Sequence, residues 1–92
     1  MLFEWDPDKD RSNQAKHDVS FDEASGVFGD PFALTIDDTA HSGEERRFVT
    51  IGYSYRQRVV IVVHADRDDA VRLISAREAT QAERRLYEQR AH

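Results

Sequence analysis

The chain has 92 residues, no cysteine, 39% hydrophobic residues and a formal net charge of −5. This length allows one hydrophobic core, so we expect a single domain over residues 1–92. The lack of cysteine excludes disulfides and thiolate metal sites. No apolar run approaches the ~18 residues of a membrane span, so we expect a cytoplasmic protein with no membrane partner.

Charge is distributed unevenly along this chain. Residues 1–45 hold twelve acidic and three basic residues, a net charge of −9, whereas residues 46–92 hold ten arginines, no lysine and six acidic residues, a net charge of +4. Arginine binds phosphate through two parallel hydrogen bonds and keeps its charge at cellular pH. Because the Debye length is only about 8 Å at physiological ionic strength, this local density favours an arginine surface that binds nucleic acid, despite the acidic mean.

The first half of the sequence predicts three elements: a strand over residues 2–5, a helix over 7–17 and a helix over 21–28. Asp6-Pro7 is typical of an N-cap followed by the first helical position. Ser20 and Glu23 have the spacing of a capping box, and Gly29-Asp30-Pro31 ends the second helix. The first helix is polar nearly all round, so we expect tertiary partners to hold it.

The second half predicts four strands and a helix: strands over residues 32–36, 48–55, 58–64 and 70–76, and a helix over 81–90. The β-branched run Val59–Val63 is typical of a central strand covered on both faces. We expect a hairpin tip at 56–57 and a turn at 66–69. Thr80 and Glu83 form a second capping box. The predicted order is β-α-α-β-β-β-β-α.

Asn13, Lys16 and His17 lie on neighbouring positions of one helical turn. A histidine beside a lysine is suited to proton transfer near neutral pH, while the lysine binds phosphate. A simpler structural explanation is also open, because basic residues at a helix C-terminus interact favourably with the helix dipole.

Three arginines near the last predicted strand are further candidates. Because side chains alternate along a strand, we expect Arg72 and Arg77 on opposite faces of the sheet. Arg67 lies in the predicted turn and Arg77 just past the strand end, where scaffolds often present binding groups. Arg72 stands in an otherwise apolar strand and must find a carboxylate or line an open face. Pairing with an acid for solubility is the structural alternative.

Other polar residues have structural explanations beside the functional ones. His64 ends the buried strand and is more simply a structural histidine, although its place at the sheet rim keeps it a candidate. The capping box explains Glu83, and Tyr87 is most simply a core residue. The pairs Asp37-Asp38 and Asp68-Asp69 lack the spacing of a calcium loop, so we expect no metal and no cofactor.

Five blocks follow one another along nearly the whole chain. They are Phe3-x-Trp5-Asp6-x-x-Lys9, Asn13-x-x-Lys16-His17-x-Val19-Ser20-Phe21-x-Glu23-Ala24, Phe28-x-Asp30-Pro31, Glu45-x-Arg47-Phe48 and Ile74-Ser75-Ala76-Arg77-x-Ala79-x-x-x-Glu83-Arg84-x-x-Tyr87. In this order they resemble the BrnT family, the toxins of a type II toxin–antitoxin system. Asp18 stands where the family usually has glycine.

The resemblance implies an α+β fold similar to RelE-type ribonucleases, with a four- to five-stranded, mainly antiparallel sheet flanked by three helices. It also implies RNA as substrate, growth arrest, and a hetero-oligomer with a BrnA-like antitoxin that carries a ribbon-helix-helix domain. We expect that interface to bury at least ~1,000 Å² and to include a sheet edge or the last helix. With the residues argued above, the catalytic candidates are Arg77, Arg67, His17, His64, Glu83 and Tyr87. The substrate-binding candidates are Lys9, Lys16 and Arg72.

The leading hypothesis is a metal-independent endoribonuclease in which the RNA 2′-hydroxyl attacks the adjacent phosphorus. Arg77 and Arg67 would stabilise charge, with His17 or His64 transferring protons. This hypothesis expects the arginines to gather in one cationic pocket. The alternative is a non-catalytic module that binds a partner through its acidic face and an exposed sheet edge. A metal-dependent nuclease is a third interpretation.

Overall fold

The computed structural model describes residues 1–41, 43 and 45–91. Its strands are β1 (Leu2–Glu4), β2 (Leu34–Asp37), β3 (Arg47–Tyr53), β4 (Val59–Arg67) and β5 (Ala70–Glu78). Its helices are α1 (Pro7–His17), α2 (Phe21–Gly26) and α3 (Gln81–Ala91), with short 3₁₀ turns η1 (Val27–Gly29) and η2 (Thr39–His41). The predicted α+β class and element order are confirmed.

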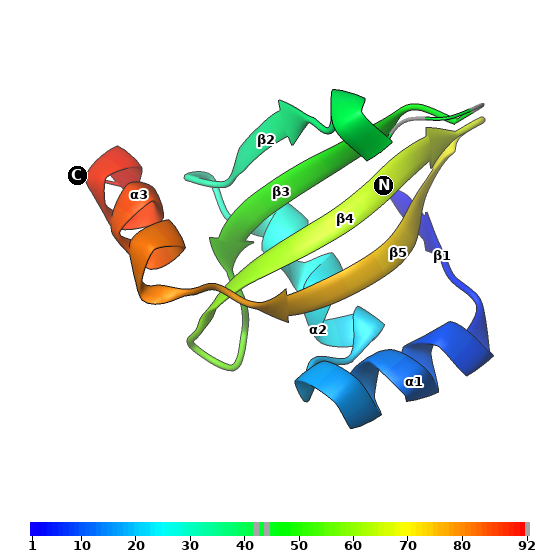
Figure 1. Ribbon diagram of the computed structural model, residues 1–92, viewed down its shortest axis with the longest axis horizontal. Coiled ribbons are helices and arrows are strands. Elements are labelled where there is room, and N and C mark those ends of the chain that lie inside the picture. The colour runs from blue at the N-terminus through cyan, green and yellow to red at the C-terminus, as the bar shows by residue number, and fades with distance from the viewer. Residues whose placement is uncertain (42, 44, 92) are drawn as a thin grey trace.

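The five strands form one sheet in the order β1-β5-β4-β3-β2 (Figure 1). β1 runs parallel to β5, and each of the other neighbouring pairs is antiparallel. The predicted, mainly antiparallel sheet is therefore confirmed, and the run Val59–Val63 lies in its central strand. No helix in the described part of the chain has the length and apolar character needed to cross a membrane.

The two faces of the sheet are packed differently. Val60 and Val62 of β4 are fully buried in a core formed with α2 and η1, which lie behind the sheet in Figure 1. On the other side of the same strand, Val59 and Ile61 pack with Tyr87 of α3 in a smaller core. We call the first side the covered face. The second is the open face, because α3 stands at one end of the sheet and leaves a groove beside it.

β5 contains a bulge that decides where its arginines point. Val63 pairs with Ser75, but the next residue of β4, His64, pairs with Leu73, so Ile74 is an extra residue. Such an insertion resets the alternation of side chains. Arg72, Ser75 and Arg77 consequently share the open face. The prediction that Arg72 and Arg77 lie on opposite faces is wrong, because alternation alone takes no account of the inserted residue.

A buried asparagine joins α1 to the edge of β5. β1 pairs only with residues 70–72 of β5. The backbone groups along the rest of this edge of β5 therefore need other hydrogen-bond partners. The Asn13 side chain donates to the Ala76 and Val19 carbonyls, each at 2.8 Å, and accepts from the Ala76 N–H at 3.1 Å. The expectation that tertiary partners hold this polar helix is confirmed. The contact also sets the C-terminus of α1 against β5.

Several predicted boundaries shift in the structure. β4 continues to Arg67 and β5 to Glu78, so Arg67 and Arg77 both lie within strands and not in the turn or past the strand end. The turn narrows to Asp68-Asp69, where Asp68 takes a left-handed conformation with φ of 54°. The predicted second helix ends earlier, at Gly26, and passes into η1. The tip of the β3–β4 hairpin spans residues 54–58 and is longer than the two residues expected.

Candidate functional site

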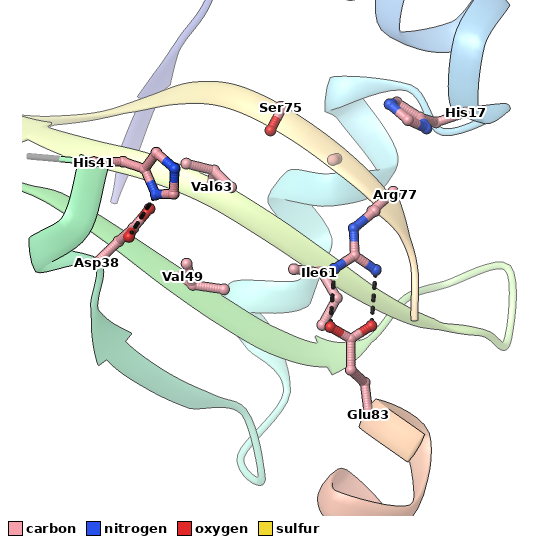
Figure 2. Close-up of a pocket in the computed structure, with 10 residues that line it drawn as sticks. His17, Asp38, His41, Val49, Ile61, Val63, Ser75, Arg77 and Glu83 are labelled. Carbon is pink, nitrogen blue, oxygen red and sulfur yellow. Dashed lines mark hydrogen bonds and ion pairs between the residues drawn. The ribbon is translucent and has the colours of Figure 1, made fainter. Parts of the chain in front are cut away.

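An open groove of about 520 Å³ lies on the open face of the sheet (Figure 2). Val49, Ile61 and Val63 form its floor. Its rim is polar and comes from four separate segments: His17, Asp38, His41, Ser75, Arg77 and Glu83. An apolar floor with a few convergent polar groups is typical of a binding site in a small protein.

Arg77 and Glu83 form a bidentate ion pair at one end of the groove. The two guanidinium nitrogens lie 2.7 and 2.8 Å from the two carboxylate oxygens of Glu83 (Figure 2). The Thr80 N–H also donates to Glu83 at 2.9 Å, which completes the predicted capping box. Hydrogen bonds from Arg77 and Thr80 lower the pKa of Glu83 to about 2. Glu83 therefore stays ionised at neutral pH, and a carboxylate of such low basicity accepts protons poorly. Its ion pair instead positions the Arg77 guanidinium.

His17 approaches the same end of the groove from the last turn of α1 (Figure 2). The helix ends at Asp18, which adopts a left-handed conformation with φ of 57°, and its N–H donates to the Gln14 carbonyl at 2.9 Å. Together with the Asn13 contact, this ending places the backbone of His17 beside β5. The structure thus brings His17 and Arg77, which are sixty residues apart in sequence, to one site.

A second, shallower depression extends the basic rim along α1. Its volume is about 250 Å³, and it shares His17 and Ser75 with the main groove. Lys9 and Lys16 line it from one face of the helix. The predicted substrate-binding lysines are therefore adjacent to the groove and in line with it.

Arg67 and Arg72 lie on the open face but outside the main groove. They line a third depression of about 230 Å³ with Glu4, Trp5 and Asp6. The expectation that Arg67, Arg72 and Arg77 share one cationic pocket is not met. Arg77 lines the main groove, whereas Arg67 and Arg72 line the third depression on the same face. The two sites are separate because β1 and the turn between β4 and β5 lie at the far end of β5 from Arg77.

His64 faces away from the groove. It is 4% exposed, its ring stacks on Phe48 at 5.8 Å and meets Phe28 edge-on at 4.8 Å, and its Nε2 lies 2.7 Å from the Thr50 hydroxyl. Burial lowers the pKa of His64. Of the two histidines expected to transfer protons, the structure places His17 at the groove and His64 in the core of the covered face.

Tyr87 also has a structural position. It is 7% exposed, and its hydroxyl donates to the Asp30 carboxylate, which also accepts the Tyr53 N–H at 2.8 Å. Burial and the hydrogen bond to Asp30 raise the pKa of Tyr87 to about 12. Tyr87 therefore lies in the smaller core, and its hydroxyl points to Asp30.

Asp38, His41 and Ser75 line the groove but were not among the predicted site residues. His41 Nδ1 lies 3.0 Å from an Asp38 oxygen at the end of the groove opposite Arg77 (Figure 2). Asp38 and His41 come from the polar segment between the strands predicted over residues 32–36 and 48–55, where no helix or strand was expected. Their position follows from the pairing of β2 with β3, which no local pattern reveals. Within residues 1–41, 43 and 45–91, no cluster of three or more His, Asp or Glu side chains has the arrangement of a metal site.

Comparison with known proteins identifies the family and the fold of this chain. A family model described as "Ribonuclease toxin, BrnT, of type II toxin-antitoxin system" matches residues 5–83. The 1.1 Å crystal structure of the Brucella abortus ribonuclease toxin BrnT matches with a TM-score of 0.66 and 22% sequence identity, over 88% of this chain and 100% of that chain. At this identity the likeness concerns the fold. No curated protein sequence matches. The resemblance seen in the sequence is confirmed, and the chain belongs to the BrnT family of ribonuclease toxins of type II toxin–antitoxin systems.

Proposed function

We propose that this protein is a toxin endoribonuclease that cuts RNA in the Arg77 groove without a metal ion and thereby arrests growth. The observation that supports the proposal is that Arg77 and His17 line the same open groove on the sheet. The family description supports RNA as the substrate class. The lysines of the adjoining depression supply further positive charge for the phosphate backbone.

The proposed reaction is a transfer within the RNA strand. The 2′-oxygen forms a bond to the adjacent phosphorus, the bond from phosphorus to the 5′-oxygen breaks, and a cyclic phosphate remains. A base takes the 2′-hydroxyl proton and an acid returns one to the leaving 5′-oxygen, and His17 is the proton-transfer group at the groove. Arg77 stabilises the negative charge that develops on the phosphoryl oxygens, and Glu83 holds its guanidinium in place. Lys16 positions a neighbouring phosphate.

Arg77→Ala should lower the cleavage rate by about 10²–10³-fold, because one preorganised cation contributes about that much to transition-state stabilisation. The measurement is cleavage of a labelled RNA in EDTA, with detection of the cyclic phosphate end. Arg85→Ala, which removes an exposed arginine of α3, is the matched control and should cleave as the wild type does. In cells, Arg77→Ala should relieve growth arrest. Cleavage that requires added Mg²⁺ would contradict the metal-free part, and a wild type that leaves RNA and growth intact would favour the partner-binding module.

We further infer that the antitoxin is BrnA-like, with a ribbon-helix-helix domain, and that it docks on an apolar groove beside the proposed active site. This groove of about 110 Å³ lies between β2, β3 and α3. Ile36 and Leu86 on its rim are 56% and 55% exposed, and β2 is one of the two edge strands of the sheet. Val49, Ile61 and Glu83 line both grooves. A segment seated here is therefore continuous with the Arg77 groove and blocks RNA.

The double variant Ile36→Glu with Leu86→Glu should weaken antitoxin binding by about 100-fold or more, since it places two charges in the apolar centre of the interface. Calorimetry with the purified antitoxin measures the affinity. Leu2→Glu is the matched control, because Leu2 is 66% exposed on β1 at the opposite edge of the sheet. Equal affinities for the double variant, the control and the wild type would place the antitoxin elsewhere.

A further inference from the structure

The third depression, at the far end of β5 from the Arg77 groove, is lined by two arginines, a tryptophan and two carboxylates, Glu4 and Asp6. The Asp6 carboxylate is engaged in capping α1, where it accepts from the Asp8 N–H at 2.8 Å. Arg67 reaches the depression from β4, Arg72 from β5, and Trp5 from the segment after β1. Cationic side chains beside an aromatic ring are the pairing that binds single-stranded nucleic acid, with the cation on the phosphate and the ring on the base. A role for this depression in RNA binding rests on the proposed function, because it would be a second place where the RNA substrate binds.

The bulge at Ile74 aligns this depression with the active groove. Without the inserted residue, Arg72 would point into the covered face when Arg77 points into the open one. With it, Arg72, Ser75 and Arg77 follow one another on the same face. Four strand steps separate Arg72 from Arg77, a distance of about 13 Å, so the two arginines contact different nucleotides of one strand.

The charges of the depression are available to a ligand. The Arg67 Nε lies 4.0 Å from Glu4, and the two side chains are 55% and 46% exposed, which describes a loose surface pair that a phosphate can replace. No carboxylate of the described residues lies within ion-pair distance of Arg72. Arg77, by contrast, is held by two short hydrogen bonds to Glu83. The far depression thus offers Arg72, together with Arg67, whose long and exposed pair with Glu4 a phosphate group can replace.

Trp5 is held in place for such a contact. It is half-buried and packs against the core of the covered face, where its ring meets that of Phe21 edge-on at 6.2 Å. The same residue also lines the depression. A fixed ring at the surface loses little conformational freedom when a base stacks on it. We propose that Arg67, Arg72 and Trp5 form a second subsite for single-stranded RNA, which binds the phosphate and base of a nucleotide a short distance along the strand from the cleaved bond.

Trp5 is the chain's single tryptophan, so tryptophan fluorescence reports on the surroundings of this one residue. The probe is a non-cleavable 2′-deoxy oligonucleotide of about ten nucleotides, compared with a dinucleotide that fills only the Arg77 groove. The longer probe should quench Trp5 and bind more tightly than the dinucleotide. In Arg72→Ala and in Arg67→Ala, this advantage of the longer probe should fall about tenfold, and the slope of log K against log salt should become less steep by about 0.7.

Arg85→Ala is the control for the loss of one positive charge, and it should keep both the length advantage and the salt slope of the wild type. Arg67→Ala guards against a folding defect in Arg72→Ala, since more than half of the Arg67 side chain is exposed. A wild type that cleaves RNA but shows no Trp5 quenching, or variants that keep the full length advantage, would overturn the subsite and leave the nuclease proposal standing. A wild type that neither binds nor cleaves RNA would overturn the nuclease proposal itself.

Discussion

His64 is a buried titratable side chain whose surroundings disfavour its protonated form. Its ring lies between Phe28 and Phe48, and its one hydrogen bond within the described structure joins Nε2 to the Thr50 hydroxyl. Burial therefore lowers the pKa of His64 in the folded protein. In the unfolded chain the same imidazole is in water and titrates near its ordinary value of about 6.5.

This difference predicts a loss of stability in weak acid. Because the folded-state pKa is the lower one, the contribution of His64 is fully present above about pH 6.5 and is lost as the pH falls toward the folded-state value. The free energy of unfolding, measured by urea denaturation, should decline between pH 7.5 and pH 5.5. His64→Gln should reduce this decline, and His17→Gln, which changes an exposed histidine, should not. Equal pH dependence in His64→Gln and the wild type would assign the decline to another group.

At the scale of elements, the starts of the helices were predictable because they depend on neighbours in sequence. Asp6 accepts from the Asp8 N–H at 2.8 Å, Ser20 from the Glu23 N–H at 3.0 Å and Thr80 from the Glu83 N–H at 3.2 Å. Each of the three predicted N-cap residues forms its capping hydrogen bond in the structure. A capping bond closes within three residues, so no distant part of the chain has to be known.

The same elements also have features that local sequence patterns do not predict. The carboxylate of Glu23 does not complete its box but turns to Arg58, thirty-five residues later, at 2.6 and 2.7 Å. The bulge at Ile74 is defined only by the pairing of β5 with β4. Asn13 was singled out as a neighbour of His17, yet its amide binds the backbone of Ala76. Each of these three features depends on a partner distant in sequence, which spacing within a segment cannot supply.

At the scale of the whole molecule, folding reduces the charge separation seen in the sequence. Arginines of the second half pair with acids of the first half: Arg46 with Asp37 at 2.7 Å, Arg58 with Glu23 at 2.6 Å, and Arg67 with Glu4 at 4.0 Å. The expectation of a continuous arginine surface is met only on part of the open face. The open face therefore carries separate cationic sites, around Arg77, around the α1 lysines, and around Arg72 with the loosely paired Arg67.

The pair between Glu23 and Arg58 is the most buried of these links and joins α2 to the start of β4. The side chains are 1% and 15% exposed, and the Ser54 hydroxyl also donates to Glu23 at 2.6 Å. The hydrogen bond from Arg58 lowers the pKa of Glu23, so the carboxylate stays charged in the core. A buried pair of this kind contributes little when it is replaced as a whole, because both ions lose their hydration. The loss of Glu23, however, leaves the largely buried Arg58 with two longer and more exposed pairs, to Glu78 at 3.4 Å and to Asp18 at 3.9 Å. Removing one partner is therefore expected to cost more than replacing the pair as a whole.

Glu23→Gln should therefore lower the free energy of unfolding by about 3–5 kcal/mol, measured by urea denaturation at pH 7. Replacing both partners, as Glu23→Leu with Arg58→Met, should recover a large part of that loss, since no buried charge then remains. Glu88→Gln breaks an exposed pair with Arg84 on α3 and should change stability by about 1 kcal/mol or less. If Glu23→Gln cost no more than Glu88→Gln, water would be reaching Arg58, and α2 would be held to the sheet by its apolar contacts alone.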